Sequence, residues 1–386
     1  MKRREFIQCA ALSTLAAAAS PLAGTCLAAE PEKRAAPSGH RAPGQERVID
    51  FEAHYLDPAL LQWLHGRKTP PLYDPENQIL VLWGDVKADP SMRMDPGLLL
   101  DVGEKRIAAM DEAGVDVQLL SSTLPLDVFP GGEKPAEVMR RMNDELAGLI
   151  AAHPERFKGM AALAPHDPKT AARELKRCVR DLGFVGWQLH SHFYHEAAYA
   201  DDQRYLPIWE AAAELDIPVY IHPTLPVMPA LQGYGYELAG STFGFAIETS
   251  ILMVRLLLSG LFEKLPTLKV IQAHMGETLP MLVERMDEQI MSKCPAYKLP
   301  KLPGDYWRSN VWCSVSGSFS KSVFALLRSQ KSMDKILFGS DYPYENYQGC
   351  TAFVNSLDIS EKERAMIYSQ NAASAFGIGL AAQAEL

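Results

Sequence analysis

The stretch "VIDFEAHYLDP", Val48 to Pro58, begins as a buried strand and ends in two side chains that can bind a metal ion. Its apolar start predicts a strand of the protein interior, and Glu52 and His54 lie two residues apart near its end. Because residues i and i+2 of a strand point to the same face, the two side chains converge on one small volume. This strand end predicts either a metal site or a strand that has reached solvent.

Short apolar runs alternate with segments of helical periodicity along the rest of the chain, which predicts βα units around a parallel sheet. The predicted strands are "VIDFEAH" (48–54), "VDVQLLSST" (115–123), "KGMAALA" (158–164), "FVGWQLHS" (184–191), "PVYIHP" (218–223), "KVIQAHM" (269–275), "NVWCSVS" (310–316) and "KILFGSD" (335–341). Eight units in one chain of this size predict an α/β fold with a single (β/α)8 barrel. A doubly wound open sheet is the alternative, but no glycine-rich phosphate loop follows the first strand.

Polar side chains that can bind a metal ion end five of the eight predicted strands. They are Glu52 and His54 on the first strand, His190 and His192 on the fourth, His222 on the fifth, His274 on the sixth and Asp341 on the eighth. A closed barrel brings the carboxyl ends of its strands into one pocket. Imidazole and carboxylate ligands suit Zn²⁺ or Mn²⁺, and we therefore predict one divalent metal ion with open coordination positions at this face.

Two connections are too long to be simple turns. They run from Tyr55 to about Asp101 and from Pro223 to about Ala246, and each follows a predicted strand and precedes a predicted helix. This order places them at the carboxyl ends of the strands, where barrels build their active sites. We expect them to form lids and substrate walls.

The composition is that of a globular protein with a small-molecule partner. The 386 residues are 47% hydrophobic and 22% charged, and the formal net charge is -9 without a basic stripe. This balance argues against a nucleic-acid partner and against membrane insertion of the mature chain.

The first residues have the pattern of an export signal. Residues 1–29 combine a positive start, an apolar stretch and small residues near a plausible cleavage point. Arg3 and Arg4, followed by Phe6, resemble the twin-arginine type, which predicts a periplasmic protein. A plain secretory signal or an N-terminal anchor is the alternative. Residues 30–46 are rich in Pro, Ala and Gly and predict a linker, so the barrel domain should span 47–380.

A series of short segments occurs in order along the chain: "HPERFKGMAAL" (153–163), "DLGFVG" (181–186), "YIHP" (220–223), "SGLFEKLPTLKVIQAHMGETLP" (259–280), "ILFGSDYPYE" (336–345) and "NAASAFGI" (371–378). With this series the chain resembles the amidohydrolase superfamily from about Val48 to Phe376. The resemblance is to the amidohydrolase-related (amidohydrolase 2) branch, which includes aminocarboxymuconate semialdehyde decarboxylase and the γ-resorcylate and 5-carboxyvanillate decarboxylases.

The resemblance implies roles for individual residues. The implied metal ligands are Glu52, His54, His222 and Asp341. His274 is implied as the acid/base or substrate-orienting imidazole, and Asp341 as a second group that can deliver a proton. Glu277, three residues later, is implied to hydrogen-bond that imidazole, although a glutamate favoured by the dipole of the following helix is equally consistent.

The fourth strand departs from the pattern of these decarboxylases. It ends in "GWQLHSH" where they usually have an asparagine-containing stretch. We therefore expect His190 and Trp187 to border the substrate pocket. The export signal is a second departure, because these decarboxylases are commonly cytoplasmic.

Three functions remain open at this point. The resemblance favours a metal-dependent carboxy-lyase that decarboxylates an aromatic or unsaturated carboxylic acid. A metal-dependent hydrolase of a lactone, ester or amide, using a metal-bound water, needs the same ligands. A binding protein that has kept the fold without catalysis is the third. Dimers are frequent in the family, so a homodimer is also expected.

Overall fold

A computed structural model describes most of the predicted barrel domain. The described residues are 47–68, 72–81, 93–94, 96–122, 135–193, 198–224, 226, 228–231 and 233–379. The predicted signal (1–29) and linker (30–46) lie outside them.

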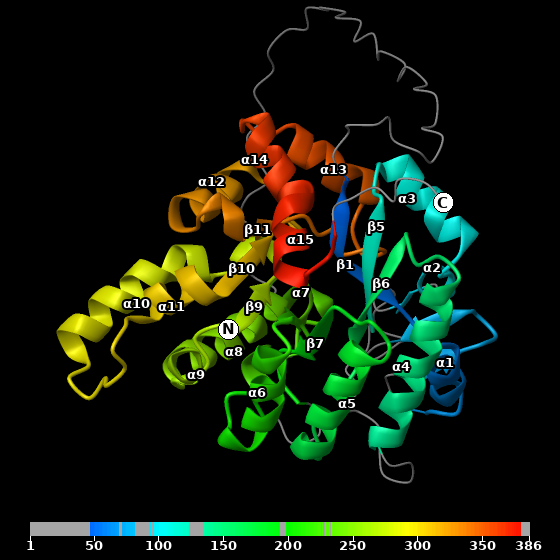
Figure 1. Ribbon diagram of the computed structural model, residues 1–386, viewed down its shortest axis with the longest axis horizontal. Helices are drawn as coiled ribbons and strands as arrows, with labels where there is room; N and C mark the ends of the chain where they lie inside the picture. Colours follow the sequence, from blue (N-terminus) through cyan, green and yellow to red (C-terminus); the bar gives the residue numbers. More distant parts are fainter. Residues whose placement is uncertain are drawn as a thin grey trace, which may run out of the picture. The chain divides into compact units, whose positions relative to one another are not determined.

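Eight parallel strands follow one another around a barrel, as the sequence predicts (Figure 1). Their bounds are β1 Ile49–Tyr55, β5 Val117–Ser122, β6 Phe157–Ala161, β7 Gly186–His190, β8 Pro218–His222, β9 Lys269–Gln272, β10 Val311–Ser314 and β11 Ile336–Leu337. Each strand pairs in parallel with the next one. The remaining three strands form a small separate sheet.

The barrel closes between its first strand and the segment after its last strand. The backbone N–H of Phe51 donates to the carbonyl of Phe338 (3.3 Å), and that of His54 donates to the carbonyl of Tyr342 (2.8 Å). Ala53 and Tyr342 also pair as a parallel bridge. These contacts form a seam between the two ends of the domain sequence, which we call the β1–β11 seam.

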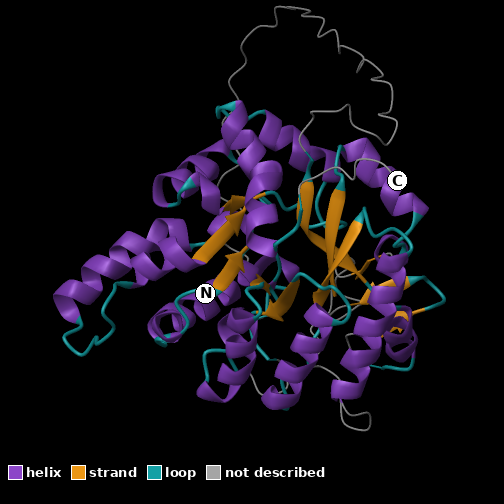
Figure 2. Cartoon of the chain, in the orientation of Figure 1, coloured by secondary structure: helices purple, strands orange, loops and turns teal. Residues whose placement is uncertain are grey.

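Helices lie outside the strands and connect each strand to the next (Figure 2). Their bounds are α1 Pro58–His65, α2 Gly97–Leu100, α3 Glu104–Ala113, α4 Pro135–Ala151, α5 Pro168–Arg180, α6 Leu206–Glu214, α7 Tyr236–Ala239, α8 Gly244–Leu258, α9 Leu261–Lys264, α10 Leu279–Lys293, α11 Pro303–Asn310, α12 Lys321–Gln330, α13 Tyr347–Asn355, α14 Glu361–Ala365 and α15 Asn371–Phe376. Helix α5 illustrates the local logic, because the Asp167 side chain accepts from two backbone N–H groups at its start and Pro168 follows in the first turn.

The strands bury side chains on both faces, which gives the protein two apolar layers. The barrel interior contains Phe51, Tyr220 and Leu337, and the layer between strands and helices contains Val219, Val270 and Ile336. Phe376 of α15 joins the interior layer, where its ring stacks on Phe51 with centroids 6.0 Å apart.

The two long connections contain regular structure of their own. The first holds α1, α2 and an antiparallel sheet of β2 Leu72–Asp74, β3 Ile79–Val81 and β4 Arg93–Met94. The second holds a 3₁₀ turn, Pro229–Leu231, and α7. The segment Tyr236–Leu258, which contains α7 and α8, is long and apolar enough to cross a membrane. Helix α8 instead buries Leu252, Met253 and Leu256 in the outer layer of the barrel, as a core helix does.

We predict that Phe376→Ala lowers the free energy of unfolding by about 3 to 5 kcal/mol, because it leaves a cavity in the closed barrel interior. Chemical denaturation should measure this loss. Tyr234, whose side chain is 73% exposed, provides the control. Tyr234→Ala should change stability by no more than about 0.5 kcal/mol, and an equally small effect of Phe376→Ala would contradict the packing described here.

Candidate metal centre and active site

A β-bulge turns the two potential ligands of β1 toward the barrel interior. The pairing with β5 moves from Asp50–Gln118 to Ala53–Leu120, so β1 contains one extra residue between these pairs. As a result Phe51 and Glu52 both face inward. The Phe51 ring lies 5.2 Å from that of Tyr220, and Glu52 Oε1 accepts from the Tyr220 hydroxyl at 2.5 Å.

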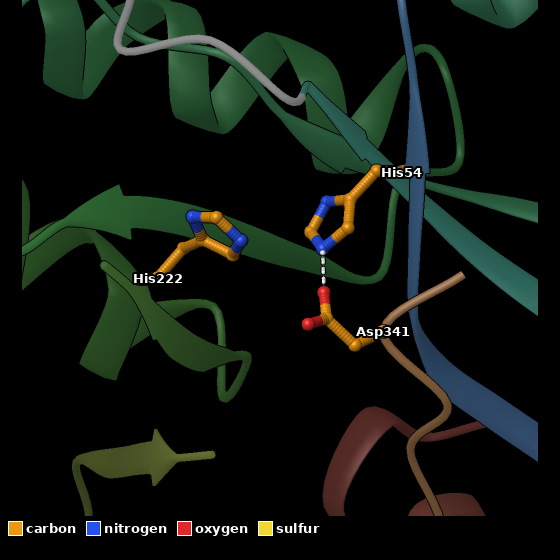
Figure 3. Close-up of side chains that lie close together, drawn as sticks. All are labelled: His54, His222 and Asp341. Atoms are coloured by element: carbon orange, nitrogen blue, oxygen red, sulfur yellow. Dashed lines mark hydrogen bonds and ion pairs between the residues drawn. The ribbon is translucent and has the colours of Figure 1, made fainter. Parts of the chain in front are cut away.

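Three potential ligands meet at the carboxyl ends of β1, β8 and β11 (Figure 3). They are His54, His222 and Asp341, whose ligand atoms all lie within 4.8 Å of one another. His54 Nε2 lies 3.0 Å from Asp341 Oδ1, and the rings of His54 and His222 have centroids 4.5 Å apart. All three side chains are buried or nearly so.

In His54 and His222 the Nδ1 atom contacts a neighbour outside this group, so the other ring nitrogen, Nε2, faces the group. His222 Nδ1 donates to the Pro223 carbonyl at 2.7 Å, because a carbonyl can only accept. Burial, with the neighbouring His54 and His190, holds the pKa of His222 well below its ordinary value. His222 is therefore a neutral imidazole with its lone pair on Nε2, the form that binds metal ions.

His54 gives the test of whether a cation fits. The Ser121 hydroxyl lies 3.2 Å from His54 Nδ1 and 3.4 Å from the Ala53 carbonyl. On the other side of the ring, His54 Nε2 lies 3.0 Å from Asp341 Oδ1. This contact requires a proton between the two atoms, and a divalent ion could bind both atoms in its place, so the donor set fits a cation that displaces a proton.

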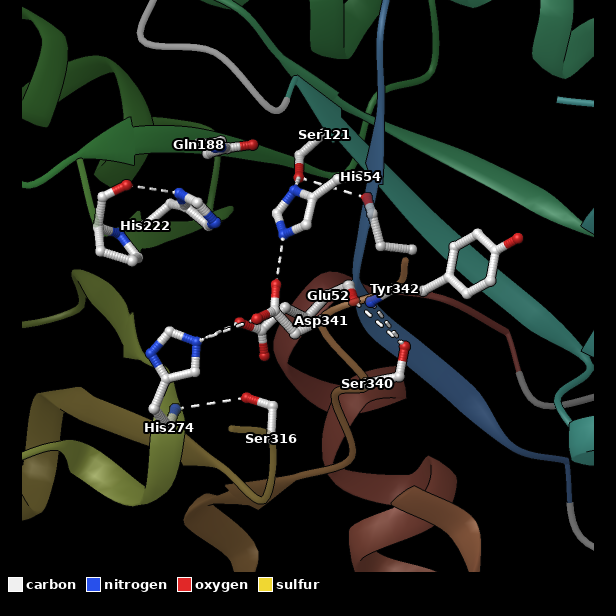
Figure 4. A network of polar contacts seen from close by, with 12 residues as sticks. Glu52, His54, Ser121, Gln188, His222, His274, Ser316, Ser340, Asp341 and Tyr342 are labelled. Atoms are coloured by element: carbon white, nitrogen blue, oxygen red, sulfur yellow. Dashed lines mark hydrogen bonds and ion pairs between the residues drawn. The ribbon is translucent and has the colours of Figure 1, made fainter. Parts of the chain in front are cut away.

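A second group shares Asp341 and contains Glu52 and His274 (Figure 4). His274 Nε2 lies 3.2 Å from Glu52 Oε1 and 3.8 Å from Asp341 Oδ2. On the other side of the ring, Nδ1 lies 2.7 Å from Glu277 Oε1. Burial alone would lower the pKa of His274, but Glu277 and Glu52 outweigh it and raise the pKa well above its ordinary value. Three carboxyl groups therefore lie around the His274 ring and favour its protonated form.

Asp341 remains ionised at the junction of the two groups. Burial alone would raise its pKa, but the contacts with His274 and His54 outweigh burial and hold the pKa well below its ordinary value. The carboxylate thus faces His54 through one oxygen and His274 through the other.

Unusual backbone conformations hold these residues. His274, Met275, Gly276 and Glu277 have consecutive positive φ angles, and Asp341 has φ 58°. The residues other than glycine in this conformation cost about 1 to 3 kcal/mol each, and such residues cluster at functional sites. Space is equally restricted, because a Cβ on Gly317 would lie 2.6 Å from the His274 ring and a Cβ on Gly339 2.6 Å from Glu52 Oε2.

A family model described as amidohydrolase matches residues 49–378. The chain belongs to the amidohydrolase family. A γ-resorcylate decarboxylase of Polaromonas sp. strain JS666 is 37% identical over 287 residues, which cover 72% of this chain and 88% of that protein. A γ-resorcylate decarboxylase of Rhodococcus jostii strain RHA1 is 36% identical over 291 residues, with the same coverage.

Solved structures of this amidohydrolase family agree with the fold. A dihydroxybenzoic acid decarboxylase from Polaromonas sp. JS666, with bound manganese and the inhibitor 2-nitroresorcinol, matches with a TM-score of 0.75 and 32% identity, covering 86% of this chain and 98% of that one. A 5-carboxyvanillate decarboxylase from Sphingomonas paucimobilis matches with a TM-score of 0.75 and 32% identity, covering 87% and 100%. Both confirm the superfamily branch predicted from the sequence.

The structure separates the two residues of β7 that the sequence assigned to the pocket of this amidohydrolase. His190 lies beside His222, with ring centroids 5.6 Å apart, and burial lowers its pKa to about 3. Trp187 packs against Trp209 of α6, with ring centroids 5.3 Å apart. The expected substrate contact of Trp187 is therefore corrected: residues three positions apart on a strand face opposite sides, and β7 turns His190 inward and Trp187 outward.

Several site residues escaped the sequence analysis. Ser314 and Ser316, on and just after β10, lie 2.6 Å apart. Ser314 Oγ contacts Glu52 Oε2 (3.2 Å) and also accepts from the His274 backbone N–H (3.1 Å). The spacing of two residues at a strand end is the signal that marks these serines, and the same spacing links Tyr220 to His222.

Asp50 supports the site from the outer face of β1. Its carboxylate accepts from the Ser340 backbone N–H (2.9 Å), from the Ser340 hydroxyl (2.6 Å) and from the Glu52 N–H (3.2 Å). Burial raises its pKa to about 7. Arg106, also buried, donates to the carbonyl of His54 at 2.9 Å. The two side chains therefore fix the backbone of Glu52, His54 and the residue before Asp341.

We predict that Asp50→Asn weakens metal binding about tenfold to a hundredfold, as loss of a supporting contact does in metal sites. Titration of metal-free protein with Mn²⁺ or Zn²⁺ at pH 8, where Asp50 is ionised, measures the affinity. Asp111→Asn is the control, since Asp111 pairs with Arg156 and is 30% exposed. Equal metal affinity of the two variants would show that Asp50 does not position the ligands.

Proposed function

We propose that this protein is a metal-dependent decarboxylase of an aromatic carboxylic acid. The observation that carries the proposal is an imidazole, His274, held between Glu277, Glu52 and Asp341 beside a cluster suited to a divalent ion. Decarboxylation needs a proton for the carbon that loses carbon dioxide, and His274 Nε2 lies where it could supply one. The named activities of the similar relatives support the same reaction.

We infer that one divalent ion, Mn²⁺ or Zn²⁺, completes the site. His54, His222 and Asp341 would hold it, with Glu52 as the fourth predicted ligand from the adjoining group. When bound, the ion would act as a Lewis acid that holds and polarises oxygen atoms of the substrate. Manganese is present in three structures of similar decarboxylases, which favours it over zinc.

Individual residues of the chain would then have separate roles in the reaction. In the reaction the bond between the ring carbon and the carboxylate breaks, its electron pair stays on the ring carbon, and that carbon takes a proton. His274 Nε2 supplies the proton, and Glu277 keeps Nδ1 bonded so that the ring holds its orientation. Glu52 and Asp341 stabilise the charged imidazole before the transfer.

The hydrolase alternative has less support. It uses the same ligands, but the similar proteins named above are decarboxylases. The binding-protein alternative does not explain the strained backbone at residues 274–277, since such strain is typical of active sites.

We predict that two histidine variants separate metal binding from proton transfer. His222→Ala should lower metal content and activity together, because it removes a ligand. His274→Ala should keep the metal and the thermal unfolding profile but lower turnover about 10² to 10⁴-fold. The measurements are elemental analysis and carbon dioxide release from 2,6-dihydroxybenzoate. Loss of metal in His274→Ala would make His274 a ligand, and wild-type hydrolysis of lactones without carbon dioxide release would favour the hydrolase.

We further propose that the first 29 residues direct the folded protein to the periplasm by the twin-arginine route. The proposal rests on Arg3 and Arg4 ahead of Phe6. Replacing both arginines by lysine should leave the precursor in the cytoplasm, which cell fractionation with immunoblotting can measure. Unchanged export of the double variant would indicate the general secretory route instead.

A further inference from the structure

The inner face of β7 carries two polar side chains beside the metal cluster. Gln188 and His190 are two residues apart and face the barrel interior, whereas Trp187 and Leu189 belong to the outer layer. His190 pairs in register with His222 of β8. A substrate held next to His222 therefore lies within reach of His190.

The contacts of Gln188 fix the orientation of its amide. Gln188 Nε2 donates to the Ser122 carbonyl at 2.9 Å, and the reverse orientation would place two oxygen atoms against each other. The same amide nitrogen lies 3.4 Å from His190 Nε2. Because an amide N–H₂ can only donate, His190 Nε2 must accept, and the proton of the neutral ring is on Nδ1.

The Nδ1–H group of His190 has no hydrogen-bond partner among the described residues, and the side chain keeps 9% of its surface accessible. Two neighbouring atoms, Gln188 Oε1 and Ser122 Oγ, are buried without a partner in the described part of the chain. Buried polar atoms without partners are rare in proteins. A polar group from outside the described chain is therefore expected to complete this corner.

That group is not the metal ion. The described groups of ligand atoms within 4.8 Å of one another contain His54, His222 and Asp341, or Glu52, His274 and Asp341, and neither includes His190. The donor atom of His190 that could bind a metal, Nε2, is already occupied by Gln188.

We propose that His190 Nδ1–H donates a hydrogen bond to an oxygen of the bound aromatic acid. The inference rests on the proposed function, because it concerns the substrate of that reaction. A neutral donor in a partly dehydrated wall favours an oxygen over a hydrogen at the facing ring position, since a ligand without the oxygen leaves the N–H group unpaired. His190 thus determines specificity, and His274 and Asp341 serve the proton transfer.

His190→Phe tests this role, because it keeps an aromatic ring and removes the donor. The probe is 2-nitroresorcinol, which has no carboxylate to lose and whose hydroxyl groups flank the nitro group. Calorimetry of the metal-loaded protein should show a dissociation constant raised about 10- to 100-fold. KM for 2,6-dihydroxybenzoate should rise by a similar factor, while metal content and the melting temperature stay near those of the wild type.

Two further variants serve as controls. Trp187→Phe changes the outer face of the same strand and should leave the dissociation constant within about twofold. His190→Asn returns a shorter donor and should recover part of the affinity lost in His190→Phe, which a purely structural role would not produce. If His190→Phe does not fold, the comparison of His190→Asn with the wild type carries the test.

The outcomes separate the inference from the proposed function. Unchanged affinity and KM in His190→Phe, with a wild type that releases carbon dioxide, would overturn the role of His190 alone. Loss of metal in the same variant would also overturn it, because His190 would then belong to the metal site. A wild type that neither binds 2-nitroresorcinol nor releases carbon dioxide from aromatic acids would overturn the proposed function, and the inference with it.

Discussion

The β1–β11 seam is the constraint on which the site depends. A backbone hydrogen bond from His54 to Tyr342 and the pairing of Ala53 with Tyr342 place the first and last strands side by side. Glu52 and His54 come from one side of the seam and Asp341 from the other, 287 residues after His54. An open sheet with the same strands would keep every ligand and lose the site, because the carboxylate would lie at the opposite edge.

Polar contacts strengthen the β1–β11 seam next to the site, where the side chains must be held in accurate positions. Asp50 accepts from the N–H groups of both Glu52 and Ser340, so one carboxylate links the two strands. An apolar side chain at this position would contribute burial but would leave two N–H groups without partners, which costs about 1 to 3 kcal/mol each. The buried Asp50 carboxylate thus fixes the positions of Glu52 and Ser340, although it contributes less apolar packing than a hydrophobic side chain would.

Sequence reasoning found the eight strands because each is a short, almost continuous apolar run, which is typical of strands buried on both faces. The same property hides which face is inward. Trp187 and His190 were assigned to one pocket although they face opposite sides of β7, and hydrophobicity could not separate them since both layers are apolar. The bulge in β1, which turns Phe51 and Glu52 to the same side, leaves no signal in a pattern of period two. The serines of β10 were missed because small polar residues are common at strand ends.

Because the two sides of the seam lie far apart along the chain, they are synthesised at different times. His54 is synthesised early and Asp341 late, and at about 5 to 20 residues per second the interval is roughly 15 to 60 seconds. During that interval the growing chain carries histidines and carboxylates without the closed ring that arranges them. An ion that binds this cluster could therefore be acquired only near the end of synthesis or afterwards, and its capture would indicate that the barrel is complete.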